Sequence, residues 1–369
     1  MRKLARVLGI VGAVGAATMM LAGCAGAGSP ETNGTGITVV TTTTQLDDFV
    51  AQVAGDAGAE VTSLLQPGQS VHGFEPTAAD LEAIRMADVV IYNGMGLEPW
   101  LDDTLESAGF QGARVDASAG FTIAEDLSEH DHAAEEENHE GHDHGGEEDH
   151  EGHDHGGEEG HEGHDHGGDE GHEGHDHGAG NPHIWTSPRA AQTMVTNVAD
   201  GLATADANNA DTYRANAKSY NEKLAQLDGW ITENLDRVPA DERLLVTNHD
   251  ALTYFNHDYG VTFVGAVIPS WDDNAEPSAA QIDQLIAEIK SKQVPAIFTE
   301  QQLSPETANA IADETGVKVY AGENGLYTDA LGAEGSAGET YIGSQIHNVT
   351  QLMDSWGHEA SAAPADLVD

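Results

Sequence analysis

The chain has 369 residues, enough for two ordinary domains, and carries 14 Lys and Arg against 64 Asp and Glu, a net charge of −50. This balance argues against nucleic acid as a partner, because phosphate recognition needs basic surfaces. It suits attraction of cations, and it equally suits plain solubility in a salty exterior, so acidity alone assigns no function.

The N-terminus has the pattern of an export signal: three basic residues, a short apolar run over 7–21, and then Leu-Ala-Gly-Cys ending at Cys24. The last four residues resemble the lipobox of bacterial lipoproteins, and Cys24 is the only cysteine of the chain. The alternative, an uncleaved membrane helix, needs roughly 20 apolar residues. We therefore expect a signal peptide over 1–23, a lipid anchor on Cys24 and a flexible tether over 24–36.

Strand and helix patterns alternate after the tether. β-Branched and apolar runs predict strands, and Thr77 followed by Asp80 three residues later predicts a helix start with a capping box. The expected strands cover 37–43, 59–65 and 87–94, the expected helices cover 46–55, 77–86 and 97–109, and the segments 113–120 and 121–127 finish this part. This alternation favours a parallel sheet covered by helices.

A histidine-rich tract interrupts this pattern. One phrase, HEGHDHG, recurs every eleven residues, and no Lys or Arg falls between Glu125 and Gly178. Such a Gly-rich, charged stretch lacks the side chains to bury a core, so we expect a disordered insertion over 125–180. Imidazole and carboxylate groups bind divalent metals, which predicts weak auxiliary metal sites; the alternative is a solvated acidic linker with pH-sensitive charge. The histidines concerned are His139, His142, His144, His150, His153, His155, His161, His164, His166, His172, His175 and His177.

Ser187-Pro188 predicts the start of a long helical region that continues to about Val238, with a break near Asn208. A second α/β unit follows, with expected strands over 243–248, 261–267, 294–300 and 317–322 and helices over 249–260, 279–292, 306–316 and 340–356. The predicted organisation is an N-terminal lobe over 37–187, connecting helices over 188–238, a C-terminal lobe over 239–358 and a tail over 359–369 that we expect to fray. The predicted fold class is α/β, with two lobes that each hold a mainly parallel sheet flanked by helices, joined by a long rigid helix.

Ligands of open α/β sheets bind beyond the carboxyl ends of the strands, so metal-competent residues just after strands are candidates. Four fit this rule, two in each half: His72, His183, His249 and Asp329. If the lobes bring them together, three nitrogens and one carboxylate form a tetrahedral zinc set. No local motif links the four, and the alternative is that each is an ordinary loop residue with a satisfied hydrogen bond. Glu75 and Glu300 lie near the expected cleft as candidates for partners of the ligands.

The motifs around these positions resemble the metal-binding lipoproteins of ABC importers for zinc and manganese, the zinc-uptake (ZnuA-like) and TroA-like family. PGQSVHGFEPT, NPHIWTSP, NHDALTYFNHDYG and LYTDALGAEGSAGETYIGSQIHN carry the resemblance, which runs from Ile37 to about Gly357 apart from the tract. It implies the metal ligands His72, His183, His249 and Asp329, and a cluster A-I solute-binding fold with metal in the cleft. Ser70-Val71 and Asn181 depart from the family pattern, where Asp-Pro and Asp are usual, without removing a donor.

Three imidazoles with one carboxylate suit Zn²⁺ better than Mn²⁺, which prefers more oxygen ligands. The resemblance implies a lipid-anchored, monomeric protein on the extracytoplasmic face of the bacterial membrane, which captures Zn²⁺ and delivers it to an ABC permease with its ATPase. We expect no enzymatic activity, because a catalytic zinc keeps an open position that four protein ligands would close. The alternatives are a manganese-binding member, and an extracellular zinc buffer or adhesin without transport, since cell adhesion is described for some relatives.

Overall fold

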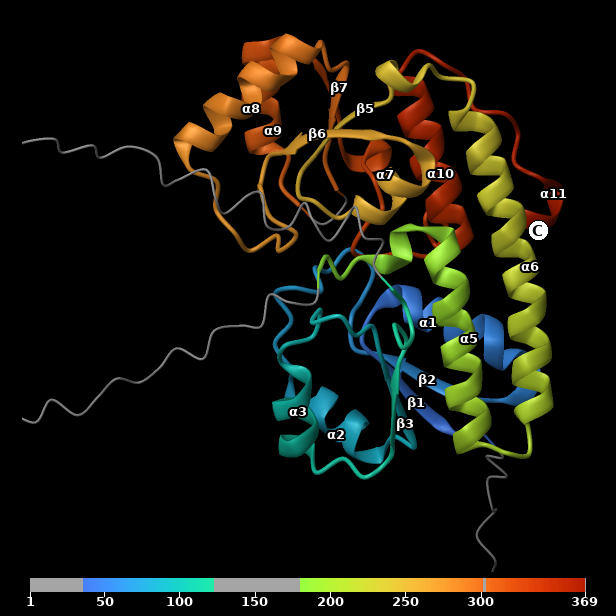
Figure 1. Cartoon of the computed structure of the whole chain (residues 1–369). Coiled ribbons are helices and arrows are strands. Elements are labelled where there is room, and N and C mark those ends of the chain that lie inside the picture. The colour runs from blue at the N-terminus through green and yellow to red at the C-terminus, as the bar shows by residue number, and fades with distance from the viewer. Residues whose placement is uncertain (1–35, 123–179, 301–302, 369) are drawn as a thin grey trace, which may run out of the picture. The chain divides into compact units, whose positions relative to one another are not determined.

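The computed structural model describes residues 36–122, 180–300 and 303–368 (Figure 1). The predicted signal peptide, Cys24, nearly all of the tether and every histidine of the tract lie outside the described residues. Within the described ranges, no helix combines the length and the apolar character that a membrane crossing requires.

The first four strands form one parallel sheet in the order β2-β1-β3-β4. The strands are β1 (Thr38–Thr41), β2 (Glu60–Ser63), β3 (Val89–Tyr92) and β4 (Ala113–Asp116), and the helices are α1 (Thr44–Ala54), α2 (Ala78–Met86) and α3 (Leu101–Ala108), with a short 3₁₀ turn η1 (Gly55–Ala57). We call these elements the N-terminal lobe. The predicted parallel sheet covered by helices is confirmed.

The two faces of this sheet pack against different helices, because successive side chains of a strand point to opposite sides. Val39 and Val89 belong to the large core that includes α1 and the following helices, whereas Val40 and Val90 belong to a smaller core with α2 and α3. The predicted capping box of α2 is confirmed: the Thr77 hydroxyl accepts from the backbone of the residue three positions on, and the reciprocal bond is present.

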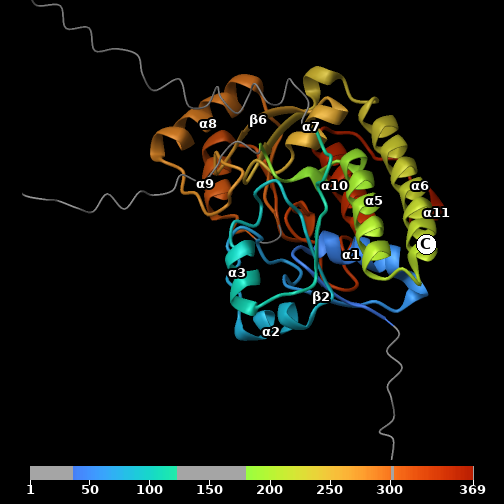
Figure 2. The same cartoon turned by 60° about the horizontal axis from the view of Figure 1, so that its bottom comes forward.

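Two long helices, α5 (Pro188–Ala205) and α6 (Ala210–Leu235), follow and lie side by side (Figures 1 and 2). Ser187 caps α5 by accepting from the Arg189 amide at 3.2 Å, with proline at the first helical position, as predicted. The predicted break falls between Asp206 and Asn209. Apolar side chains at helical spacing on one face of α6 are all buried: Tyr213, Tyr220, Leu224, Leu227, Ile231 and Leu235.

The second α/β unit, here called the C-terminal lobe, has four strands in two parallel pairs, β5 with β6 and β7 with β8, and β5 lies against β7. Its strands are β5 (Leu244–Thr247), β6 (Thr262–Ala266), β7 (Ala296–Phe298) and β8 (Lys318–Tyr320), and its helices are α7 (Thr253–Tyr259), α8 (Ala279–Lys292) and α9 (Glu306–Thr315), with 3₁₀ turns η5 (Ala240–Glu242) and η6 (Gly322–Asn324). α7 starts four residues later than predicted, because residues 249–252 form a turn after β5.

Helix α10 (Tyr341–Ser355) packs with α6 and α1, and the largest apolar core draws side chains from these helices and from α5. The described residues from 36 to 122, 180 to 300 and 303 to 368 therefore belong to one compact unit, and the predicted lobe boundaries stay a prediction. The expectation that the tail frays is wrong. Ser361 bonds to α6 through the Asn234 side chain at 2.7 Å and the Trp230 indole at 3.3 Å, and α11 (Ala365–Val368) buries Leu367.

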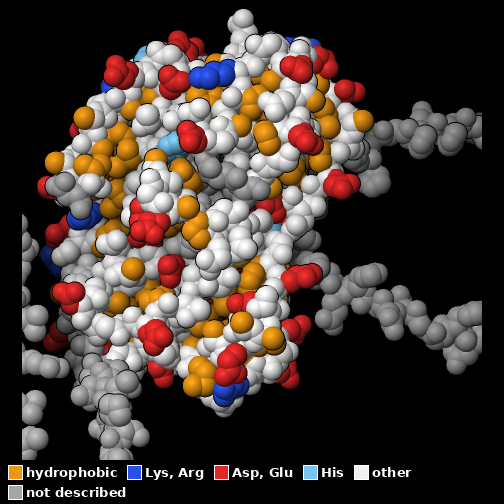
Figure 3. Space-filling view, turned by 180° about the vertical axis from the view of Figure 1, so that it is seen from behind, with side chains coloured by type: hydrophobic (Ala, Val, Ile, Leu, Met, Phe, Trp, Pro, Cys, Tyr) orange, Lys and Arg blue, Asp and Glu red, His pale blue; other side chains and the backbone are white. Residues whose placement is uncertain are grey.

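The face of the molecule seen in Figure 3 carries scattered acidic side chains and few basic ones. Several described basic side chains are held in ion pairs, such as Arg189 with Asp228 at 2.8 Å and Lys290 with Glu314 at 3.0 Å. This face therefore offers no basic patch for a polyanion.

Candidate metal centre

The structure brings His72, His183, His249 and Asp329 together, and one ligand atom from each lies within 4.8 Å of all the others. His72 lies on the loop after β2, and His183 directly precedes the 3₁₀ turn η4 (Ile184–Thr186). His249 follows β5, and Asp329 follows β8 and η6. Loops beyond the carboxyl ends of parallel strands thus supply the cluster from both lobes, where α/β sheets place their ligands.

The distances between donor atoms in the cluster match those around a tetrahedrally coordinated cation. Asp329 Oδ1 lies 3.3 Å from Nε2 of both His183 and His249, and Oδ2 lies 3.6 Å from His72 Nε2. The Nε2 atoms of His72 and His183 are 3.1 Å apart. Donors bound tetrahedrally to zinc at about 2.0–2.1 Å stand about 3.3 Å from one another. The four donor atoms therefore surround a space of the size that Zn²⁺ fills.

The cluster also leaves buried polar atoms without hydrogen bonds. The four side chains are at most 2% exposed. His249 Nε2 and both carboxylate oxygens of Asp329 have no hydrogen-bond partner in the described part of the chain. A buried polar atom without a partner costs about 1–3 kcal/mol, and a cation at the centre of the four residues would satisfy all three atoms. The residues therefore fit a divalent metal.

His249 is oriented by Glu300, which lies at the end of β7. The His249 ring donates from Nδ1 to Glu300 Oε1 at 2.6 Å, which leaves the Nε2 lone pair for the centre. Thr328 donates its hydroxyl to the other Glu300 oxygen at 2.9 Å. Glu300 is 2% exposed and touches a proposed ligand, in line with its predicted role.

His183 is oriented by Asn181, one of the departures from the family pattern. The Asn181 side-chain oxygen accepts from the His183 ring at 2.8 Å and from its backbone amide at 3.1 Å. Its amide nitrogen donates to the carbonyl of Asp250 at 2.7 Å and to the Thr253 hydroxyl at 3.0 Å. An amide, unlike a carboxylate, can accept on one side and donate on the other, so Asn181 ties His183 to the segment next to His249.

Burial lowers the pKa of His72 to about 4 and lowers the pKa of His183, although the charge of Asp329 opposes both shifts. Burial also disfavours charged His249, but the carboxylates of Asp329 and Glu300 outweigh it and raise the pKa of His249 well above its usual range. Burial acts to raise the pKa of Asp329, yet His249 and His183 hold it well below its usual range. The two carboxylates therefore stabilise the protonated form of His249, whereas burial stabilises the neutral forms of His72 and His183.

Sequence reasoning missed several residues around the cluster. The Trp271 ring lies 5.6 Å from the His72 ring, and Asp273 from the same loop raises the pKa of His72 electrostatically. Ser70, the other departure from the family pattern, accepts from the His72 backbone amide at 3.2 Å. No local pattern marks the loop of Trp271, whereas the departures at Ser70 and Asn181 were visible in the motifs.

Glu75, the other candidate partner, is exposed on the loop before α2. Across residues 36–122, 180–300 and 303–368, no hydrogen bond or ion pair joins Glu75 to the four side chains. Its role at the site therefore stays a prediction without a contact behind it.

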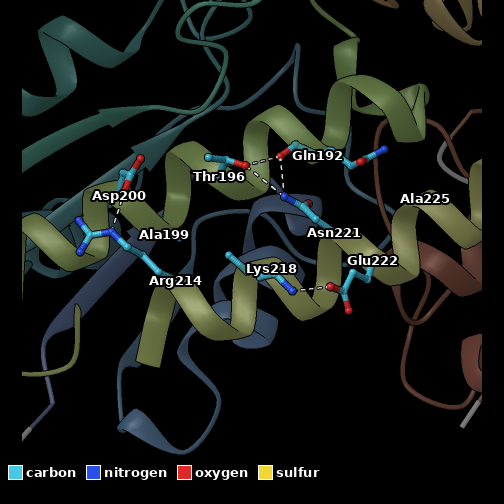
Figure 4. A pocket seen from close by; sticks show the side chains of 10 residues that line it. Gln192, Thr196, Ala199, Asp200, Arg214, Lys218, Asn221, Glu222 and Ala225 are labelled. Carbon is cyan, nitrogen blue, oxygen red and sulfur yellow. Dashed lines mark hydrogen bonds and ion pairs between the residues drawn. The ribbon is translucent and has the colours of Figure 1, made fainter. Parts of the chain in front are cut away.

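A surface hollow of about 510 Å³ lies between α5 and α6 (Figure 4). Its charged side chains are already paired, Arg214 with Asp200 at 3.2 Å and Lys218 with Glu222 at 2.6 Å. Asn221 bonds across the helices to the Gln192 carbonyl at 3.2 Å. Because these groups satisfy one another and none belongs to the metal cluster, the hollow is not the functional site.

The chain is similar to known metal-binding proteins over most of its length. Residues 39–355 match the family model described as Zinc-uptake complex component A periplasmic (ZnuA). The chain is 29% identical over 321 residues to the iron-binding protein YfeA of Yersinia pestis, covering 86% of each chain. It is 29% identical to the manganese-binding lipoprotein MntA of Halalkalibacterium halodurans, covering 89% of this chain and 93% of the relative.

Among solved structures, the periplasmic zinc-binding protein TroA of Treponema pallidum superposes with a TM-score of 0.68 at 23% identity, over 87% of this chain and 99% of TroA. At this identity the likeness shows the fold, and it confirms the predicted two-lobe α/β architecture. The family model covers most of the chain, and the predicted resemblance is confirmed. The chain therefore belongs to the ZnuA family of periplasmic metal-binding, ABC-transporter substrate-binding proteins.

Proposed function

We propose that this chain captures Zn²⁺ between His72, His183, His249 and Asp329 and delivers it to an ABC permease for import. The observation that carries the proposal is the convergence of three imidazole nitrogens and one carboxylate in a buried cluster whose inward atoms lack other partners. The relatives are named for iron and manganese, and the structural neighbour for zinc, so the donor set must decide the metal.

The donor set favours zinc. Nitrogen-rich, four-coordinate sites suit Zn²⁺, whereas Mn²⁺ prefers six ligands that are mostly oxygen. Asp329 Oδ1 lies 3.3 Å from Nε2 of both His183 and His249, which is the donor spacing of a four-coordinate zinc site. A manganese-binding role remains the alternative within the same family.

Metal capture exchanges a proton for a cation. His249 holds a proton between Asp329 and Glu300, and Zn²⁺ requires its neutral form. The arriving ion displaces that proton and satisfies both Asp329 oxygens, so loading ties the two lobes together at one point. Release then requires the lobes to separate, which we assign to the permease.

The remaining parts of the proposal concern segments outside the described residues. Cys24 carries the lipid anchor that holds the protein on the extracytoplasmic face of the membrane, and the histidine tract gathers Zn²⁺ at weak sites. Capture by His72, His183, His249 and Asp329 involves no catalysis, because four protein ligands leave no open coordination position on the metal. The alternative class of function is an extracellular zinc buffer or an adhesin. Permease and ATPase genes next to the gene for this chain would favour transport over this alternative.

Calorimetric titration of the mature chain with Zn²⁺ and with Mn²⁺ tests the proposal. We expect one tight site for Zn²⁺, weaker binding of Mn²⁺, and loss of the tight site in Asp329→Ala. Asp283→Ala removes an exposed carboxylate of α8 and serves as the matched control that keeps the tight site. A tight site that survives Asp329→Ala refutes the proposed cluster.

A further inference from the structure

The backbone carbonyl of Thr328, directly before Asp329, is held by two donors from the N-terminal half of the chain. Gln45, in the first turn of α1, donates from Nε2 at 2.9 Å, and Trp185, in η4, donates from Nε1 at 2.7 Å. Gln45 and Thr328 are each 2% exposed and Trp185 is 1% exposed, so water does not compete with either donor for the Thr328 carbonyl. We call this arrangement the Thr328 bracket.

Residues on the other side of Asp329 bond to the same helix. The backbone amide of Leu331 donates to the Thr44 hydroxyl at 2.8 Å, and Thr44 is the first residue of α1. The Asp329 segment is thus attached to the N-terminal lobe both before and after the carboxylate. Its link to the C-terminal lobe runs through β8 and through the Thr328 hydroxyl, which donates to Glu300 at 2.9 Å.

The N-terminal end of the bracket is itself braced. The Tyr341 hydroxyl of α10 donates to the Trp185 carbonyl at 2.6 Å, and the Tyr341 amide donates to Asp48 of α1 at 3.2 Å. The ring of Trp185 also lies 5.0 Å from the ring of His183. The indole is therefore fixed in place on both sides, and its N–H has one direction in which to donate.

We propose that Gln45 and Trp185 are positioning residues that clamp the fourth metal ligand, Asp329, to the N-terminal lobe and thereby set how slowly the cleft releases its metal. The proposal rests on the proposed capture of metal at Asp329. When the lobes separate, Asp329 must leave either the histidines of the N-terminal lobe or His249 of the C-terminal lobe. The bracket adds two hydrogen bonds to the cost of the first route.

The chemistry of a shared acceptor makes a sharp prediction. A carbonyl has two lone pairs and remains satisfied when one of its two donors is removed. A single loss then removes one net hydrogen bond, which corresponds to about a twofold to tenfold change in rate. Loss of both donors leaves a buried carbonyl without a partner, which carries an additional desolvation penalty. The double variant must therefore exceed the product of the two single effects.

The experiment measures release of Zn²⁺ from the full mature chain, loaded with one equivalent, into an excess of a colorimetric chelator. The slow phase that disappears in Asp329→Ala reports the cleft. The variants are Gln45→Met, which keeps side-chain length without the donor, Trp185→Phe, which keeps an aromatic ring without the N–H, and the double variant. Gln284→Met changes an exposed glutamine of α8 and is the matched control.

We expect each single variant to speed the slow phase about twofold to tenfold, and the double variant to exceed the product of the two, with the association rate within about twofold of wild type. Gln284→Met should match wild type. Unchanged release in the double variant, together with an intact slow phase in wild type, overturns the bracket and leaves metal capture standing. A wild-type chain without any slow phase overturns metal capture and the bracket together.

The melting temperature of the metal-free variants separates positioning from general packing. One outcome is an equal loss of melting temperature in the metal-free and loaded forms, with a double-variant effect on the release rate equal to the product of the two single effects. That result assigns Gln45 and Trp185 to structure alone and overturns the proposal. A larger loss in the loaded form, with the excess in the double variant, supports it.

Discussion

Replacing Glu300 by glutamine tests how the cluster controls its metal. The Glu300 carboxylate accepts from His249 Nδ1 at 2.6 Å, a charge-assisted hydrogen bond. Such bonds contribute about 1.5–3 kcal/mol, against about 0.5–1.5 kcal/mol for neutral ones. Glu300→Gln keeps the shape and the acceptor but removes the charge, so Zn²⁺ affinity should fall by roughly 1–1.5 kcal/mol, or about tenfold, at alkaline pH.

The same substitution should change the pH dependence in the opposite direction. Glu300 helps to raise the pKa of His249, so in wild type a proton competes with Zn²⁺ well into the neutral range. Without this charge the pKa of His249 falls, the proton competes less, and the affinities of variant and wild type should approach each other as pH decreases.

The assay is competition calorimetry against a chelator at several pH values, with the affinity of the chelator known at each pH. Glu306→Gln, an exposed carboxylate at the start of α9, is the control and should follow wild type throughout. A Glu300→Gln curve parallel to wild type at every pH would refute the assignment of the His249 proton. An unchanged affinity at alkaline pH would refute the orienting role of Glu300.

Three further predictions follow from the same geometry. Below the raised pKa of His249, the Zn²⁺ affinity of the wild type should fall about tenfold per pH unit, because one proton competes with the metal. The fall should become steeper only near pH 4, where His72 takes up a second proton. An affinity that calorimetry finds constant between pH 5 and 8 contradicts histidine ligation. Removing residues 125–178 should abolish weak Zn²⁺ binding and keep the one tight site in titration; loss of the tight site would make the tract the receptor. Asn181→Asp replaces the amide group that donates to the Asp250 carbonyl by an oxygen that can only accept. Its free energy of unfolding, measured in urea without metal, should therefore fall by about 1–3 kcal/mol. An unchanged unfolding midpoint would remove Asn181 from the network around His183.

Much of the architecture was predictable because its signals are local. The Thr77 capping box, the Ser187-Pro188 helix start and the apolar face of α6 each depend on residues within a few turns of one another. The location of the metal cluster was predictable for a topological reason: parallel strands end at a common edge, so residues that directly follow strands converge there.

Local patterns could not identify the partners of the cluster, because these pairs depend on how the lobes pack. Glu300 was only one of two equal candidates, and it contacts His249 while Glu75 stays on the surface. Gln45 donates a hydrogen bond to the Thr328 carbonyl, 283 positions away in the sequence, and no motif around Gln45 predicts this bond. The composition of the tail predicted fraying, yet hydrogen bonds of the Ser361 backbone to side chains of α6 hold the tail in place.

The amino-acid sequence by itself determined the class of fold, the family and the four candidate ligands, since strand periodicity, helix caps and short motifs are properties of neighbouring residues. Only the tertiary structure decided which groups orient those ligands, which carboxylates stabilise the protonated form of His249 and how Asp329 is tied to both lobes. The physical reason is that hydrogen bonds and charge interactions act over a few ångströms in space, whatever the separation along the chain.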